Sequence, residues 1–330
     1  MQLTDAIDTA EQAALREAVR ELVRQHADAS AWKRLIVEMG LAGLAVPEAL
    51  GGVGATLAEV AVVVAETGRA LTPVPYLSTA LAAALLAEGG ASDLLPGLLD
   101  GSATAAFAFD GDIASGEDAT LTGSARFVLD GPGAAVFLVR AGERVAAVRA
   151  ADATVRPVET LDQTRTQAHV TFDRAPALAL TVDAGRAEQL VQVLLAVEAA
   201  AAAEHCLDAT VDYLKTRVQF GRPIGLFQAL RHRCADLAVE VAGASATARA
   251  AVQAAVTDDP ELPVLAPLAK RHCADVFLHV AGETIQLHGG IGFTWEHEAH
   301  RYFKRAKSSQ LLFGTSSQLR RVVAERAGLL

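Results

Sequence analysis

The sequence predicts a mainly helical protein with a small central β domain. Apolar residues recur at helical spacing through most of the first hundred residues. Short β-branched or alternating runs, separated by Gly, Asp and Pro, follow from about Ser102. Helical patterns return after Pro176. We therefore expect an N-terminal helical domain at 1–103, a reduced β domain at 104–180 and a C-terminal helical bundle domain at 181–330.

The first hundred residues are expected to be entirely helical. An amphipathic helix is predicted at about 8–26, because Leu15, Val19 and Leu22 fall on one face and charged residues on the other. Three further helices are predicted at 31–39, 57–69 and 77–88. The segment 47–54 and the prolines after residue 72 interrupt them, since both are rich in turn formers.

The central part is expected to form short strands, because its apolar runs are brief and bounded by turn residues. The predicted strands lie at 105–109, 119–121, 126–129, 135–139, 145–149 and 167–172.

The C-terminal part is expected to be a bundle of long helices. Residues 186–219 contain neither Gly nor Pro, so they predict one helix of about 50 Å at 1.5 Å per residue. Three more helices are predicted at 226–256, 264–288 and 296–312. A last helix should begin at Thr315, because Thr-Ser-Ser-Gln is a capping-box sequence.

Composition excludes several classes of protein. The formal net charge of -10 argues against a nucleic-acid partner, which would require a basic face. No uncharged apolar run reaches the ~20 residues of a membrane span, and the first residues lack the pattern of a secretory signal. A cytoplasmic protein is expected. Cys206, Cys234 and Cys273 are far apart, so we expect helix-packing cysteines and no metal site.

Two segments of the C-terminal part carry candidate binding residues. The segment 217–228, Arg-Val-Gln-Phe-Gly-Arg-Pro-Ile-Gly-Leu-Phe-Gln, offers a cation, an aromatic ring and turn amides, which would suit a nucleotide diphosphate. It fits an ordinary helix-turn-helix corner equally well. The segment 286–296 places three glycines directly after a helix, where one would suffice as a cap. Three glycines favour close approach of a ligand or another chain to the backbone.

These segments resemble the acyl-CoA dehydrogenase family, in which R-x-x-F-G-x-x-x-x-x-x-Q and Q-x-x-G-G-x-G occur in this order. Residues 40–52 look like the family's G-x-x-G-L-x-x-P-E-x-x-G-G turn, so the resemblance covers nearly the whole chain. The resemblance implies FAD as the cofactor, held at its ADP part across a dimer interface in the neighbour's site. The residues so implied are Arg217, Phe220, Gly221, Gln228, Gln286, Gly289, Gly290 and Thr315.

The chain departs from this family where the chemistry occurs. Family members remove the substrate's α-proton with a glutamate, often in a Y-E-G-T segment, where this chain has Phe313. A subset carries the base early in the long helix, where this chain has Val191. We therefore expect no catalytic base in this chain. Glu198, further along the same helix, is a less favoured candidate, because a helix-interface glutamate is the simpler interpretation.

The flavin-ring contacts of the family are also altered. The T-E-P-x-x-G-S-D loop is replaced by Phe-Ala-Phe-Asp-Gly-Asp at 107–112. The W-I-T-N strand is replaced by Phe-Val-Leu-Asp at 127–130, which puts Leu129 in place of a hydroxyl residue. The chain's own flavin pocket is therefore expected to be defective.

Retained motifs serve a neighbour's cofactor, and lost motifs serve the chain's own. The chain thus resembles the short subunit of bacterial α2β2 acyl-CoA dehydrogenases, which pair it with a longer subunit and act on bulky, often steroid-derived, acyl-CoA. The resemblance implies an acyl-CoA substrate and an electron-transfer flavoprotein or similar acceptor. Two alternatives stay open: a self-sufficient homotetramer with an unconventional base, and a flavin-free scaffold or acyl-CoA-binding protein.

Overall fold

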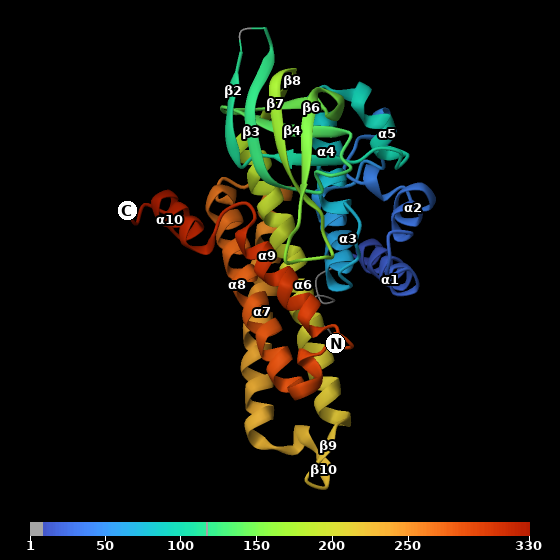
Figure 1. Ribbon diagram of the computed structural model, residues 1–330, viewed down its shortest axis with the longest axis vertical. Coiled ribbons are helices and arrows are strands. Elements are labelled where there is room, and N and C mark those ends of the chain that lie inside the picture. Colours follow the sequence, from blue (N-terminus) through green and yellow to red (C-terminus); the bar gives the residue numbers. More distant parts are fainter. Residues whose placement is uncertain (1–8, 117) are drawn as a thin grey trace.

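The computed structural model describes residues 9–116 and 118–330 and places a β domain between two helical regions (Figure 1). The predicted fold class is confirmed. Residues 1–8, where the predicted first helix and any leader would begin, lie outside the described residues. The first strand begins at Ala105 and the longest helix at Ala184. The three domain limits themselves stay a prediction.

The N-terminal region is helical, as predicted. Its α-helices are α1 (Ala10–Gln25), α2 (Ala31–Lys33), α3 (Leu57–Arg69), α4 (Tyr76–Glu88) and α5 (Leu95–Leu99). The predicted helix at 31–39 is shorter, because a π-helical turn, Arg34–Glu38, follows α2. Thr56 caps α3 through a capping box with Glu59, which explains why that helix starts where its apolar pattern starts.

The β domain consists of two four-stranded sheets, ordered β1-β4-β5-β8 and β2-β3-β7-β6. Their strands are β1 (Ala105–Ala108), β2 (Gly111–Ser115), β3 (Thr120–Leu129), β4 (Val136–Ala141), β5 (Arg144–Arg149), β6 (Ala153–Val158), β7 (Gln167–Pro176) and β8 (Leu178–Asp183). The runs predicted at 119–121 and 126–129 form the single strand β3, whose register against β7 shifts twice. Strands β2, β6 and β8 were not predicted. The inward faces of the two sheets share a core that includes Phe137 and Phe172.

The C-terminal region is built on long helices. These are α6 (Ala184–Thr216), α7 (Gln228–Val256), α8 (Leu262–His288), α9 (Ala299–Leu311) and α10 (Ser316–Arg326). Helix α6 is long and apolar enough to cross a membrane, but 89% of its most apolar window is buried inside the protein, as expected of a core helix. Thr315 caps α10 in the predicted capping box with Gln318.

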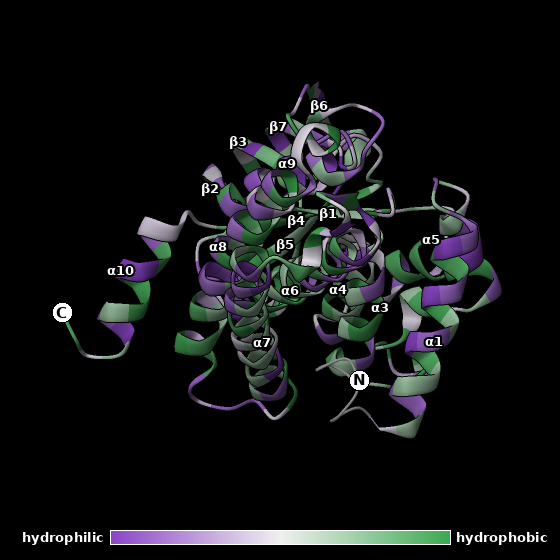
Figure 2. Ribbon diagram, turned by 90° about the horizontal axis from the view of Figure 1, so that it is seen from below, coloured by the Kyte–Doolittle hydropathy of each residue, from purple (hydrophilic) through white to green (hydrophobic). Residues whose placement is uncertain are grey.

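Two features of this region prepare the site. A hairpin of β9 (Val218–Gln219) and β10 (Arg222–Pro223) joins α6 to α7 at the end of the bundle farthest from the β domain (Figure 1). Helix α10 stands away from the body, with apolar and hydrophilic residues mixed along it (Figure 2). The buried cysteines, Cys206 and Cys273, pack within the helical core.

Candidate functional site

The first motif forms a sharp corner at the end of α6. The helix stops at Arg217, whose backbone becomes extended while its N–H still donates to the Tyr213 carbonyl at 2.8 Å. Phe220 and Gly221 then both take positive φ, 52° and 74°, as the two-residue turn of the β9–β10 hairpin requires. A phenylalanine in this conformation is uncommon, and its side chain is 90% exposed. An exposed aromatic ring in a strained turn favours contact with something outside the chain.

The polar groups of this corner are open. Arg217 is exposed and forms no ion pair with any residue that the structure describes. The Arg222 guanidinium lies above the Phe227 ring, 4.3 Å from its centroid, and Phe220 packs edge-on against the same ring. Gln228 opens α7 and is exposed. The corner therefore presents a free cation and an amide beside an aromatic pair.

The second motif forms the end of α8. Gly289 takes φ 63°, which ends the helix, and Gly290 follows in the 3₁₀ turn η7 (Gly289–Phe293). A Cβ added at Gly290 would meet no atom within 4 Å among the described residues. Contacts within the chain therefore do not require glycine at 290, whereas a ligand or partner lying against the backbone would. Gln286 and both glycines are exposed.

The two corners lie side by side. The Tyr213 ring, one turn before Arg217, stacks on the His288 ring at 4.4 Å between centroids. The His297 ring also packs against His288, with centroids 4.4 Å apart. Phe293 ends η7 and Trp295 follows it, and the two side chains are 86% and 75% exposed. All but one of the predicted cofactor residues thus gather at one end of the bundle, on a surface with exposed aromatic rings.

Thr315 is the exception. Its neighbour Ser316 donates to Asp275 at 2.8 Å and accepts from Arg271, so the start of α10 packs on the middle of α8. Gln286 lies further along α8, roughly 17 Å away at 1.5 Å per residue. The Thr315 hydroxyl donates to Gln318 as part of the cap. Within one chain, Thr315 does not join the other predicted residues, and its contact with a cofactor stays a prediction.

A pocket of about 760 Å³ lies near Thr315, between the β domain and helices α6, α9 and α10. Phe107, Phe109 and Phe313 line it together with the altered segment around Phe127. The Phe109 and Phe313 rings meet edge-on, with centroids 6.3 Å apart. The segments that depart from the family's flavin-ring pattern therefore come together in space, and phenylalanine rings line the space between them.

The turn that carries Phe313 is firmly held. Phe313 takes φ 51°, and its carbonyl accepts a hydrogen bond from Gln192 at 3.2 Å. The Lys270 ammonium donates to the carbonyls of Gln310 and Gly314, at 3.0 and 2.6 Å. Burial lowers the pKa of Lys270 to about 7. Helix α8 thus fixes the elbow between α9 and α10.

Neither predicted base position holds a proton acceptor. Phe313 lines the pocket, and Val191 is fully buried in the core. Leu129, which stands where a hydroxyl residue was expected, is buried as well. The three side chains are hydrocarbon, so they can shape a cavity but cannot move a proton.

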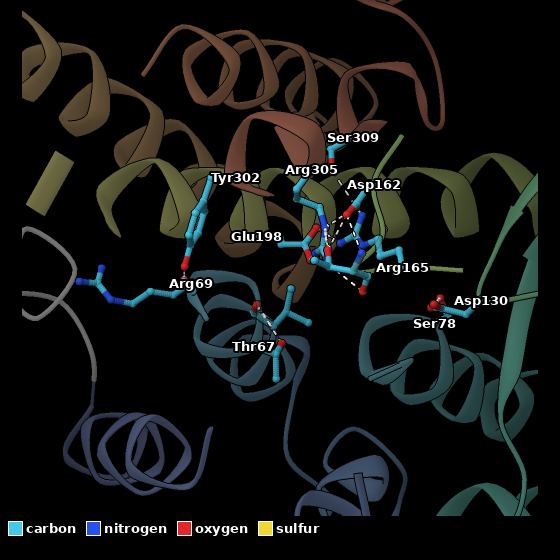
Figure 3. Close-up of polar contacts among 12 residues, drawn as sticks. Thr67, Arg69, Ser78, Asp130, Asp162, Arg165, Glu198, Tyr302, Arg305 and Ser309 are labelled. Carbon is cyan, nitrogen blue, oxygen red and sulfur yellow. Dashed lines mark hydrogen bonds and ion pairs between the residues drawn. The ribbon is translucent and has the colours of Figure 1, made fainter. Parts of the chain in front are cut away.

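Glu198 is tied into a buried ion cluster. Figure 3 shows Glu198 of α6, Arg305 of α9, and Asp162 and Arg165 of the β6–β7 loop pointing toward one another. Arg305 donates to Glu198 at 2.8 Å and to Asp162 at 2.7 Å, and Arg165 forms a second ion pair with Glu198. Each oxygen of the Glu198 carboxylate is paired with a guanidinium group, so neither is free to approach a substrate proton, as a general base must. The structure therefore favours the helix-interface interpretation of Glu198.

Neighbouring carboxyl groups show how the cluster balances its charge. Burial opposes ionisation of Asp162, but Arg305 and Thr164 outweigh it and hold the pKa of Asp162 below its ordinary value. Burial raises the pKa of Asp130 to about 6 against the hydrogen bond from Ser78. The cluster links α6, α9 and the β domain, so its first role is to hold these elements together.

Several site residues escaped prediction. Gln189 and Gln192 line the pocket from α6, and Lys270 supports its elbow from α8. Each is a polar residue within an otherwise apolar helix face, which is the signal that sequence alone offered. Arg165 and Arg305 gave no such signal, because only the fold brings them to Glu198.

Comparison with known proteins identifies the architecture. Residues 9–102 match the family described as acyl-CoA dehydrogenase, N-terminal domain, and residues 190–328 match acyl-CoA dehydrogenase, C-terminal domain. Among curated proteins, acyl-CoA dehydrogenase IpdE2 of Mycobacterium tuberculosis is 40% identical, over 94% of this chain and 96% of its own length. Its counterpart from Mycolicibacterium smegmatis is 38% identical over similar shares, 94% and 97%.

Two solved structures are similar over nearly the whole chain. One is the ChsE4-ChsE5 complex from Mycobacterium tuberculosis, with a TM-score of 0.89, 29% identity and 99% coverage of both chains. The other is a variant of a steroid ACAD, with a TM-score of 0.88 and 31% identity, covering 96% of this chain and 99% of that one.

Proposed function

The chain belongs to the acyl-CoA dehydrogenase family, and on that premise we propose that it is the catalytically incomplete subunit of a heteromeric, FAD-dependent acyl-CoA dehydrogenase. It completes the FAD site of a longer partner subunit, in which the base resides. When bound, FAD accepts the hydride that leaves the acyl β-carbon. This chain supplies contacts to the ADP part of the cofactor and takes no part in proton transfer.

One observation carries the proposal: the two ends of the C-terminal domain differ in what they can bind. The end of the bundle that carries the β9–β10 hairpin and η7 is called the hairpin end. There, Arg217 has no ion-pair partner among the described residues, and the backbone at Gly290 is open. The opposite end, next to the pocket and the β domain, is called the pocket end. There, Phe313 stands in place of the base that would take a substrate proton, and Leu129 stands in place of the hydroxyl residue that would contact a flavin ring. A chain that binds only the ADP part of a cofactor cannot hold it alone, so a second chain must supply the rest.

Arg217 has the central role at the hairpin end. A guanidinium group pairs with phosphate oxygens through two parallel hydrogen bonds, which suits the pyrophosphate of FAD. Gln228, Gln286 and the exposed amides after Gly289 can donate further hydrogen bonds. The exposed rings of Phe220 and Phe293 offer apolar contact to the partner's surface.

The partner and substrate follow from the relatives. A solved complex with two differently named subunits resembles this chain over its full length, which supports an α2β2 arrangement. A steroid ACAD is among the similar structures, which supports a bulky, steroid-derived acyl-CoA as the substrate class. An electron-transfer flavoprotein or similar acceptor would reoxidise the flavin.

Flavin content of the chain alone and with its partner tests this proposal. Expressed alone, the chain should bind little or no FAD, because nothing in its pocket end grips the isoalloxazine ring. Co-expressed with a longer acyl-CoA dehydrogenase subunit, it should yield a yellow complex that contains fewer flavins than chains. A stoichiometric flavin spectrum from the isolated chain would favour the self-sufficient homotetramer instead. A colourless complex would favour the flavin-free scaffold.

A further inference from the structure

We propose that Lys270 is a positioning residue: its two hydrogen bonds hold the elbow between α9 and α10, and they fit the uncharged form of its amine. The elbow consists of residues 312–315, between the end of α9 and the start of α10. Its release would let α10, which stands away from the body of the chain in Figure 2, move relative to α8. This inference goes beyond the proposed function and does not depend on it.

The elbow and the helices on either side of it need contacts from elsewhere in the chain. Phe313 and Gly314 take consecutive positive φ values, 51° and 103°, a conformation that is unfavourable for phenylalanine. Helix α9 ends at Leu311, so the Gln310 carbonyl is among the last four of the helix, which have no partner within it. Helix α10 has only 11 residues, and a helix of that length is marginal in water without packing.

Helix α8 provides these contacts. The Lys270 Nζ donates to the carbonyls of Gln310 and Gly314, at 3.0 and 2.6 Å. Further along α8, the Asp275 carboxylate accepts from the Gln310 amide and from the Ser316 hydroxyl, both at 2.8 Å. Lys270 therefore holds the backbone at the elbow, whereas Asp275 holds side chains before and after it.

The number of acceptors around Lys270 matches an amine better than an ammonium group. An ammonium group carries three N–H donors, whereas an uncharged amine carries two. Lys270 is only 2% exposed, and among the described residues its Nζ donates to two carbonyls. The ammonium form would leave one N–H without a partner and a charge away from water, and both are costly. The amine form uses both of its donors.

The charged groups around Lys270 do not offset its burial. Asp275 and Arg271 lie on α8 itself, Lys307 lies on α9, and α6 reaches the elbow with the neutral amide of Gln192. The first turn of α10 carries no charged residue. Burial is the dominant effect and lowers the pKa of Lys270 to about 7, against the charge of Asp275, which raises it.

The hold on the elbow therefore depends on pH above neutrality. When the elbow opens, Lys270 reaches water and its pKa returns to the ordinary 10.5. Between about pH 7 and 10.5 the open form thus binds more protons than the closed form, so opening is favoured as the pH falls through this range. One proton changes the ratio of open to closed form by up to about tenfold per pH unit. Below about pH 7 both forms are protonated and the ratio stays constant.

Hydrogen exchange of the α10 amides in the full chain measures this opening, because a short helix released from its packing loses its hydrogen bonds. After correction for the intrinsic exchange rate, protection in wild type should increase about five- to tenfold from pH 7.5 to 8.5. Lys270→Met removes the titrating group and should abolish this increase. Lys270→Arg keeps N–H donors but stays charged, so it should abolish the increase as well. Lys307→Met is the matched control, since Lys307 also bonds to Gln310, and it should keep the increase.

A titration of the lysine side chains by NMR, with isotope-labelled Cε atoms, tests the protonation state directly. The signal that is missing in Lys270→Met should titrate with a midpoint near 7 in wild type. A midpoint near 10.5 would overturn the proposal, as would an equal increase in protection in Lys270→Met and wild type. Loss of the increase in Lys307→Met would overturn it too. If Lys270→Met does not fold, the wild-type titration decides alone: the proposal requires one lysine signal with a midpoint near 7.

The role of Lys270 can fail independently of the proposed function. A chain whose α10 protection depended on pH in this way, but whose complex was colourless, would support the role of Lys270 and reject the proposed function. A chain that formed a yellow complex, but whose α10 protection did not change with pH, would reject the role of Lys270 and leave the proposed function intact.

Discussion

Arg305 donates a hydrogen bond to Glu198 at 2.8 Å, and the two side chains are only 2% and 9% exposed. This buried ion pair joins α9 to α6, and through Asp162 it also reaches the β domain. The two residues are more than a hundred positions apart in sequence, so the pair forms only when α6 and α9 pack together in the folded chain.

Removing one partner of this cluster should be strongly destabilising. Arg305→Met leaves Glu198 and Asp162 buried with fewer compensating charges, and breaking a buried pair in this way typically costs ~3–5 kcal/mol. Urea unfolding, followed by circular dichroism, should show that loss. Arg321→Met is the control, because the Arg321–Glu325 pair is exposed and such pairs contribute ~0–1 kcal/mol. A loss below about 1 kcal/mol for Arg305→Met would contradict the importance of the cluster.

No carboxylate of this chain should act as the catalytic base. Glu198→Gln in the co-expressed complex should reduce stability. Removing a general base lowers the rate ~10²–10⁴-fold, and the loss of turnover per flavin in Glu198→Gln should be far smaller than that. Glu296→Gln and Glu298→Gln should behave likewise in turnover. The measurement is bleaching of the flavin by acyl-CoA, with flavin content and assembly checked first. A thousandfold loss from Glu198→Gln, with flavin retained, would place the active site in this chain.

Acidification should loosen the hairpin end. Burial lowers the pKa of His288 below its ordinary 6.5, the charge of nearby His297 lowers it further, and the Tyr213 ring stacks on the His288 ring. The unfolded chain therefore takes up this proton first as the pH falls, so stability decreases below about pH 6.5. The pKa of nearby Glu298 is lowered, mainly by the hydrogen bond that His205 donates to it. The contribution of Glu298 to stability is lost only as the pH falls below 4.5, the ordinary pKa of a glutamate.

Unfolding midpoints measured at pH 7.5 and 5.5 test whether stability decreases on acidification. Wild type should lose stability between the two values, and His288→Phe should lose less, because it keeps the stacked ring and removes the titrating group. His232→Gln serves as the control, since His232 is exposed on α7, and it should lose as much stability as wild type. Equal losses in wild type and His288→Phe would assign the pH dependence to other groups.

Local patterns were sufficient for the helices but not for the sheet. Helix α3 begins and ends where its apolar pattern does, and the Thr315 capping box formed as predicted. Strands β2 and β6 were missed because they are edge strands with mostly exposed residues, so no apolar run marked them. Strand β3 was read as two strands because its register shifts break the alternation.

The same distinction holds for the candidate sites. The hairpin-end residues lie in two continuous segments, so sequence revealed them together, and the structure brings those segments into contact through Tyr213 and His288. The pocket and the ion cluster depend on contacts between distant elements, as with Gln189 facing α10 or Arg165 reaching Glu198. Such contacts follow from tertiary packing, which one sequence does not disclose.

The most direct measurement of the central claim is FAD retention in the co-expressed complex with Arg217→Ala in this chain alone. Loss of a charge-assisted contact worth roughly 1.5–3 kcal/mol should weaken FAD retention by about ten- to a hundredfold. The complex should remain assembled, and Lys215→Ala, an exposed cation two residues earlier, should retain FAD normally. Unchanged FAD content and affinity in Arg217→Ala would contradict the claim that this chain completes its partner's flavin site.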